Sequence, residues 1–470
     1  MLGARSNLAI LMLFASLLSA QVAGGSQSSL AKQELETVHV GDVGDRIVAY
    51  IKKTETFGFS GAVLAAKDGQ VIAAVAVGAA DLKGEIPNTP STLFEIASAT
   101  KQFTAAAVMR LVQDGKLSLD DPMSRHLPGV PDNCSAITVR QLLQHTSGIP
   151  GTNSFGAGND LAKVLPVFLR GGPTHPPGTH WEYWNQGYSL ASEIIARASG
   201  LEYTAYCQRA LFAPAGMSAT RFTGDAPPNI EGVSVAVGRS SRGKPRGALE
   251  HPYGEYGFQY RGMGGAVTNV WDLWRWDRAL KEQREGCLLK AETQAELFKP
   301  GLNDYALGWI VLKDVRGKTL QHHGGSVRGF VCELRRLPDD DGCVFVLANR
   351  DDVPADAIAR SVQAILLGPP YTYADAPGLL PPDLAREIAG KYKDAKGNAL
   401  AVEADGKVVR ATIQWSENKA WTTRAFIGAD EGSGVVLFEW EATEKVTISR
   451  DDNGTVTSLS IGAGRFDRSK

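Results

Sequence analysis

A serine and a lysine three positions apart are the residues of this chain best suited to covalent chemistry. Ser98 and Lys101 follow the mostly apolar run 93–97, at the start of a helical pattern. Residues at i and i+3 lie on one face of a helix, so the Lys101 amine can lie beside the Ser98 hydroxyl. A neighbouring base converts a weak serine nucleophile into a strong one. The spacing therefore predicts that Ser98 attacks a carbonyl carbon.

Ser-x-x-Lys by itself is weak evidence, because it occurs four times in the chain. The four serines are Ser29, Ser98, Ser241 and Ser416. Only Ser98 precedes a long helical run, at 103–112, which Gly115 can end as a C-terminal cap. A serine that merely caps a helix is the alternative interpretation of this position.

Two further motifs follow Ser98 in the chain, Tyr183-Trp184-Asn185 and His323-Gly324-Gly325. Alone, the first is compatible with a turn that packs aromatic rings, and the second with the glycine-rich edge of a strand. Together and in this order, the three motifs resemble those of the serine β-lactamase and penicillin-recognising group. The similar branch is that of class C β-lactamases, D-alanyl-D-alanine peptidases, D-aminopeptidases and family VIII esterases. The resemblance covers roughly residues 58–367.

The resemblance implies an acyl-enzyme mechanism on Ser98. Lys101 would act as the base, or as the cation that lowers the pKa of Tyr183, whose ordinary value is about 10. Tyr183 would carry the proton to the leaving group and activate water for deacylation. The residues alone leave open whether Lys101 or Tyr183 is the main base.

The other matching residues would position the substrate. Asn185 would hold Lys101 and an amide or carbonyl group of the substrate. The oxyanion hole would consist of the backbone N–H groups of Ser98 and of Ser326, which directly follows Gly325.

His323 bears on the substrate, because class C β-lactamases usually have a lysine there. A histidine is mostly neutral at about pH 7 and attracts a carboxylate more weakly. We therefore predict an enzyme that acts on small esters or D-amino-acid-containing peptides. The alternatives are a β-lactamase or D-alanyl-D-alanine carboxypeptidase and, in another class, a penicillin-binding sensor or scaffold that acylates without turnover. His145 is interpreted as a loop-ordering residue, not as a catalytic histidine.

The composition fits a globular enzyme with small-molecule partners. The chain of 470 residues is 43% hydrophobic, has a formal net charge of −2 and lacks a basic stripe, so we expect no nucleic acid partner. It contains neither Cys-x-x-Cys nor His-Glu-x-x-His, so we predict no metal and no cofactor. The expected partner is a small-molecule ester, peptide or β-lactam, and the oligomeric state stays open.

Residues 1–23 have the pattern of a signal peptide, with Arg5 before the apolar run 8–18 and small residues after it. The run is short for a transmembrane span. We therefore expect an exported protein, periplasmic or secreted, with no stable membrane anchor after cleavage. An uncleaved anchor is the alternative.

Five cysteines are an odd number for an exported protein, which requires at least one free thiol or an intermolecular bridge. Cys332 and Cys343 flank a turn between two apolar runs. They could form a disulfide across a hairpin, but buried free thiols are at least as well supported.

The pattern along the chain predicts an α/β fold, an α+β sandwich of an antiparallel sheet and a helical lobe, followed by a small all-β domain. The predicted segments are a signal peptide at 1–23, the hydrolase domain at 36–367, a proline-rich linker at 368–383 and the all-β domain at 384–470. Expected strands lie at 60–81, 305–312 and 330–349, and expected helices at 43–53 and 355–367. The all-β domain resembles a lipocalin-like barrel. A structural or oligomerising role suits it better than ligand binding.

Overall fold

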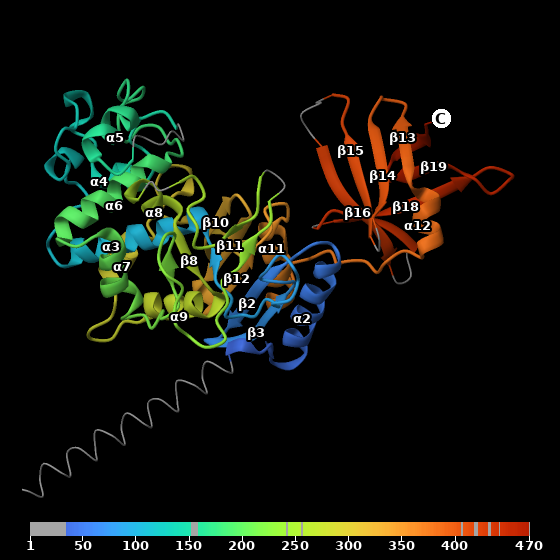
Figure 1. Ribbon diagram of the computed structural model, residues 1–470, viewed down its shortest axis with the longest axis horizontal. Helices are drawn as coiled ribbons and strands as arrows, with labels where there is room; N and C mark the ends of the chain where they lie inside the picture. The colour runs from blue at the N-terminus through green and yellow to red at the C-terminus, as the bar shows by residue number, and fades with distance from the viewer. Residues whose placement is uncertain are drawn as a thin grey trace, which may run out of the picture.

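The computed structural model describes residues 34–151, 158–240, 243–254, 257–405, 408–417, 422–430, 434–440 and 442–469. These residues form a sheet domain with a lobe of helices and, toward the C-terminus, a barrel domain (Figure 1). The predicted signal peptide lies outside the described residues.

An antiparallel sheet of seven strands, in the order β1-β3-β2-β12-β11-β10-β9, forms the centre of the sheet domain. Its strands are β1 (Val38–His39), β2 (Gly61–Lys67), β3 (Gln70–Val77), β9 (Ile310–Lys313), β10 (Thr319–Val327), β11 (Phe330–Leu337) and β12 (Gly342–Ala348). Strand β2 pairs with β12, so that Ala66 lies opposite Cys343. Segments from the two ends of the domain therefore meet in the middle of one sheet.

Both faces of this sheet are buried, as the alternating side chains of β2 show. Val63 belongs to the core beneath α2 (Gly41–Thr56) and α11 (Ala355–Leu367). The next residue, Leu64, belongs to the core shared with the helical lobe. Figure 1 shows α2 and α11 on the side of the sheet toward the barrel, and the lobe on the opposite side.

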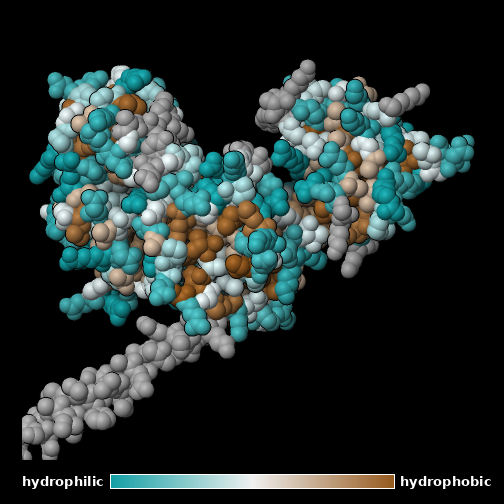
Figure 2. Space-filling view, in the orientation of Figure 1, coloured by the Kyte–Doolittle hydropathy of each residue, from teal (hydrophilic) through white to brown (hydrophobic). Residues whose placement is uncertain are grey.

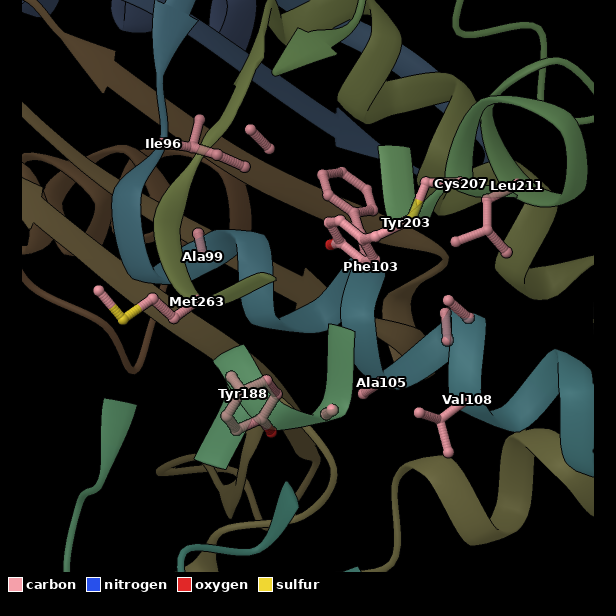
Figure 3. Close-up of a cluster of buried hydrophobic side chains, with 14 of the residues drawn as sticks. Ile96, Ala99, Phe103, Ala105, Val108, Tyr188, Tyr203, Cys207, Leu211 and Met263 are labelled. Carbon is pink, nitrogen blue, oxygen red and sulfur yellow. The ribbon is translucent and has the colours of Figure 1, made fainter. Parts of the chain in front are cut away.

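The lobe is built around α3 (Lys101–Gln113), most of whose residues are buried. Phe103 packs edge-to-face against Phe212 and Trp276, each at 5.0 Å between ring centroids. Tyr203 also lies beside Phe103 (Figure 3). This packing fixes the axis of the helix whose first residue is Lys101. The other helices of the domain are α4 (Val139–Leu143), α5 (Leu161–Phe168), α6 (Asn185–Ser199), α7 (Tyr203–Cys207), α8 (Phe258–Gly264), α9 (Val270–Lys281) and α10 (Ala291–Leu297).

Two small sheets complete the domain. Strands β4 (Phe94–Glu95), β8 (Ala266–Thr268) and β5 (Arg221–Phe222) form one, and β6 (Val237–Gly238) and β7 (Arg246–Gly247) the other. Apolar side chains gather near the middle of the sheet domain on the face shown in Figure 2, whereas the outer surfaces of the lobe and barrel are mainly hydrophilic.

Eight antiparallel strands close the C-terminal barrel. They are β13 (Gly390–Asp394), β14 (Ala399–Asp405), β15 (Val408–Gln414), β16 (Thr422–Asp430), β17 (Gly434–Phe438), β18 (Thr443–Arg450), β19 (Val456–Ile461) and β20 (Gly464–Arg468), preceded by α12 (Pro382–Ile388). Apolar side chains such as Val409 and Ile427 fill the interior. On the outside, Phe426 packs at 5.0 Å between ring centroids against Phe57, next to the end of α2. The barrel is therefore a packed body that docks on the sheet domain.

The predicted fold class is confirmed, and the helix at 355–367 has the predicted bounds. Strand β10, which contains His323-Gly324-Gly325, was not among the predicted strands. The glycines and histidines of this segment give no strand-like sequence pattern. The strand expected at 305–312 is reduced to β9, because residues 305–309 turn before it. In the barrel, the strand-like runs of the sequence correspond to β14, β15, β17, β18 and β19, whereas β13, β16 and β20 were not predicted.

The disulfide alternative is also wrong, since all five cysteines are free. Cys332 pairs across the sheet with Gly325 and Leu347, whereas Cys343 lies opposite Arg336 and Ala66. The two thiols belong to different positions along the hairpin and do not face each other.

Within the described part of the chain, every helix is too short or too polar to cross a membrane.

Candidate active site

Ser98 lies on a tight turn between a strand and a helix. The chain leaves β4, and Ala97 takes the left-handed conformation with φ of 45° before the 3-10 turn Ala97–Thr100 leads into α3. This conformation is strained for any residue with a Cβ, and the surrounding packing maintains it. The Ser98 side chain is only partly buried. The turn thus presents the hydroxyl to the cleft.

Lys101 lies fully buried directly behind Ser98. Its Nζ is 2.7 Å from Asn185 Oδ1, 2.7 Å from the Met263 carbonyl oxygen and 3.2 Å from Ser98 Oγ. Burial lowers the pKa of the amine well below its usual 10.5. When the amine is neutral, the two short contacts each take one of its N–H groups, because carbonyl oxygens only accept. The remaining lone pair can then accept the proton of Ser98.

The Tyr183 phenol is a second titratable group beside Ser98. Its phenol is hydrogen-bonded to Ser98, and burial raises its pKa above the ordinary value of 10.0. Lys101 Nζ lies 5.0 Å from the centroid of the Tyr183 ring. With a raised pKa the phenol keeps its proton, and it can donate that proton to an atom bound at Ser98.

Gly325 allows β10 to approach the turn that carries the serine. A Cβ at this position would lie only 2.0 Å from the Ile96 carbonyl oxygen and 2.8 Å from Cys332 Sγ. A glycine is therefore required for this packing. The close approach places Ser326 beside Ser98 in the wall of the cleft.

His323 is held as a neutral acceptor by its neighbours. Its Nδ1 is 2.6 Å from the Gly324 carbonyl oxygen, so Nδ1 must carry the proton. Its Nε2 therefore accepts from the Tyr305 hydroxyl, at 3.0 Å. Burial and the nearby Lys101 amine lower the pKa of His323 to about 3. The imidazole thus carries no charge that could attract a carboxylate.

His145 lies beneath the aromatic residues of the cleft. Its Nδ1 accepts a hydrogen bond from the Trp184 backbone N–H at 3.1 Å, and its carbonyl oxygen accepts from the Glu182 N–H. Its ring centroid is 4.3 Å from that of Tyr183. Burial lowers the pKa of the imidazole well below 6.5. This geometry fits a residue that orders the segment leading to Tyr183.

Ser98 lies between two halves of the cleft. The first half, of about 550 Å³, is lined by Trp181, Tyr183, Tyr305, His323, Gly324, Glu333 and neighbouring residues. The second half, of about 240 Å³, is lined by Asn185, Tyr253, Tyr260, Met263, Val327 and neighbouring residues. Tyr260 is fixed by a hydrogen bond to the buried carboxylate of Glu95. Burial raises the pKa of Glu95 to about 7, although Arg246 opposes the shift.

All the residues singled out from the sequence as a site come together here. Sequence reasoning missed Tyr305, Met263 and Glu333. Met263 contributes only a backbone oxygen, which any residue would supply. The glycine-rich segment 262–268 around it also resembles the family, but no local pattern gives Met263 a role.

A family model described as Beta-lactamase matches residues 52–367. This chain belongs to the β-lactamase family. Over 343 residues, 68% of the chain and 75% of the relative, the β-lactamase-family chain is 30% identical to a penicillin-binding protein of Bacillus subtilis (strain 168). The family membership identifies it as a serine hydrolase.

Solved structures with lower sequence identity share the fold of this β-lactamase-family enzyme. The octameric penicillin-binding protein homologue from Pyrococcus abyssi has a TM-score of 0.63 and 24% identity, and the match covers 90% of this chain and 99% of that chain. The D-amino acid amidase from Ochrobactrum anthropi SV3, complexed with L-phenylalanine amide, has a TM-score of 0.54 and 24% identity, covering 66% and 92% respectively. The first match extends across the barrel as well as the sheet domain.

Proposed function

We propose that this enzyme hydrolyses small esters and amides or peptides of D-amino acids through an acyl-enzyme on Ser98. The observation that carries the proposal is the position of the Lys101 amine. It is buried, it donates to two carbonyl oxygens, and it has its remaining site directed at Ser98 Oγ, 3.2 Å away. This is the arrangement of a serine beside a neutral base.

In the proposed reaction, Lys101 takes the proton of Ser98 as Oγ attacks the carbonyl carbon. The backbone N–H groups of Ser98 and Ser326 stabilise the oxyanion. Tyr183 gives its proton to the departing oxygen or nitrogen, which leaves a phenolate. The phenolate then takes a proton from water, the hydroxide cleaves the acyl-enzyme, and Lys101 returns its proton to Ser98. The proton count closes after each turnover.

The proposed role of Tyr183 as the proton donor to the leaving group indicates which part of the substrate each half of the cleft receives. The half lined by Tyr183 and His323 receives the leaving group, and the half lined by Tyr253, Tyr260 and Met263 receives the acyl group. The second half combines aromatic and apolar side chains with the polar groups of Asn185 and Ser326, so it suits an aminoacyl group that carries both an amine and a hydrophobic side chain.

The neutral state of His323 favours this substrate class over β-lactams and carboxypeptidase substrates. Both of those carry a carboxylate close to the scissile bond, and the imidazole next to Ser98 carries no positive charge to bind it. A D-amino acid amidase shares the fold, so the architecture can accommodate D-amino acid amides.

Mass spectrometry of the intact protein tests the proposal. The full chain is exposed to a fluorophosphonate, a penicillin, a p-nitrophenyl ester and a D-phenylalanine amide, with Ser98→Ala as the control. We expect adducts on Ser98 and turnover of the ester and the amide. Adducts that persist without turnover would instead indicate a sensor or scaffold. Faster turnover of the penicillin would indicate a β-lactamase.

Export is part of the proposal and is supported by the sequence pattern of residues 1–23. The mature protein is then expected to begin after Ala20 or Ala23. N-terminal sequencing of the protein recovered from its native compartment checks this, and an intact residue 1 would contradict it.

A further inference from the structure

A cavity of about 700 Å³ lies between the sheet domain and the barrel. It adjoins the active-site cleft, because Val353, Pro354 and Asp356 line both the cavity and the half of the cleft that contains Tyr183. A ligand that extends from Ser98 past His323 would therefore reach the barrel. The cavity is larger than either half of the cleft, so the proposed chemistry at Ser98 leaves most of this space unexplained.

The barrel wall of the cavity carries two arginines on neighbouring strands. Arg410 on β15 lies opposite Phe426 on β16, and Thr412 lies opposite Arg424. Residues two apart, and residues directly opposite on paired strands, share a face. The intervening Ala411 belongs to the barrel interior, so these four side chains are on the outside, toward the cavity.

The two arginines of the sheet-domain wall, Arg350 and Arg360, are held in ion pairs. Arg350 Nη2 is 2.7 Å from Asp352 Oδ2, and Arg360 Nη2 is 3.0 Å from Asp356 Oδ2. Both arginines of this wall therefore already have a carboxylate partner, and Asp351 adds a further negative charge, so this wall offers a carboxylate ligand no unpaired cation.

The arginines of the barrel wall are less closely paired. Within the described part of the chain, Arg424 forms no ion pair. Arg410 has only a contact of 3.6 Å to Asp405, whose side chain is 72% exposed. Glu439 is the acidic residue of this wall, and burial together with Glu444 raises the pKa of its carboxyl, so two arginines face one acidic side chain on the barrel side. The wall thus presents cationic groups beside the aromatic ring of Phe426.

We propose that this cavity is a subsite for the distal carboxylate of an extended leaving group, bound by Arg410 and Arg424. The inference rests on the proposed function for its assignment of the leaving group to the Tyr183 half. The preferred substrates are then acyl or D-aminoacyl peptides whose C-terminal carboxylate lies several residues beyond the scissile bond. The neutral His323 excludes a carboxylate next to the scissile bond, and the arginines accept one farther along.

A length series of substrates tests the subsite in the full-length enzyme. D-phenylalanyl peptides with glycine spacers of increasing length are compared as C-terminal acids and as carboxamides. We expect the acid to become the better substrate once the spacer reaches the barrel. The double variant R410Q/R424Q should raise KM for that acid by about three- to tenfold with little change in kcat. It should leave KM for the carboxamide and for a p-nitrophenyl ester unchanged.

The matched control is R465Q on β20, an exposed arginine outside the cavity that pairs with Asp467. Equal KM for acids and amides at every length, or an acid preference that survives R410Q/R424Q, would overturn the subsite. Binding of the glycine peptide acid and its carboxamide to S98A, measured by calorimetry, separates the two proposals. Acid-selective binding lost in S98A/R410Q/R424Q supports the subsite even if no substrate is turned over. Turnover of the short ester without acid-selective binding would refute only the subsite.

Discussion

Replacing Gly325 with alanine is the sharpest test of how β10 builds the site. The new Cβ would lie 2.0 Å from the Ile96 carbonyl oxygen, whereas ordinary contact begins at 3.4 Å, so the strand and the turn must separate by about 1.4 Å. The second obstacle, Cys332 Sγ at 2.8 Å, blocks a sideways escape. Because Ser326 follows directly, this displacement moves its N–H away from Ser98.

The expected kinetic cost follows from that displacement. A misplacement of about 1 Å costs roughly 10²-fold, and loss of one oxyanion donor costs about 10²–10³-fold, or about 2.7–4 kcal/mol. We therefore expect Gly325→Ala to lower kcat/KM for a p-nitrophenyl ester, and the rate of fluorophosphonate labelling, by about 10²–10³-fold. Circular dichroism and thermal melting establish that the variant is folded.

Gly324→Ala is the matched control, one residue away on the same strand. Its Cβ would lie 3.0 Å from Glu333 Oε2, a side-chain atom, so a shift of about 0.4 Å suffices to reach ordinary contact. We expect a loss of less than about tenfold. A folded Gly325→Ala enzyme within about threefold of wild type would refute the reasoning, as would equal losses in the two variants.

Three other outcomes are expected. Activity toward a neutral ester should rise with pH as Lys101 loses its proton. Because burial lowers the pKa of Lys101, the rise in activity must occur well below pH 10.5, and a pH–rate profile of the wild-type enzyme checks this. KM for a carboxylate-bearing ester should be constant between about pH 5 and 8, because His323, with a pKa of about 3, does not titrate in this range. An increase in KM through about pH 6–7 would instead indicate that His323 is a cation at low pH. Phe57→Ala should destabilise the protein by about 3–5 kcal/mol in urea unfolding, because the Phe57 ring is 3% exposed and packs on Phe426. A change in the free energy of unfolding below about 1 kcal/mol would mean that the barrel does not depend on this contact.

The sequence predicted those elements whose own pattern is strong. The helix at 355–367 has a continuous apolar face, and the strands around residue 67 have a clear turn between them. Strand β10 was missed because its segment 322–326 consists of histidines, glycines and a serine, and only pairing with β11 and β9 makes it a strand. Strand β16 was also missed, and in the structure it is paired on both sides, with β15 and β17.

The residues of the candidate site also fall into those that the sequence predicts and those that it does not. The motif residues Ser98, Lys101 and Tyr183 could be singled out because their chemistry depends on residue type and spacing. The carbonyl of Met263 and the hydroxyl of Tyr305 could not, because they reach the site from distant parts of the chain.

The charge of His323 shows why residue type alone was insufficient for specificity. A histidine at this position could be a cation, an N–H donor or an acceptor. The Gly324 carbonyl oxygen, 2.6 Å from Nδ1, fixes one proton there, and the Tyr305 hydroxyl occupies Nε2. A backbone oxygen of the strand thus selects the tautomer, and burial beside Lys101 keeps the ring neutral. The proposed selectivity against nearby carboxylates therefore depends on the conformation of β10, the same strand whose glycine brings Ser326 to Ser98.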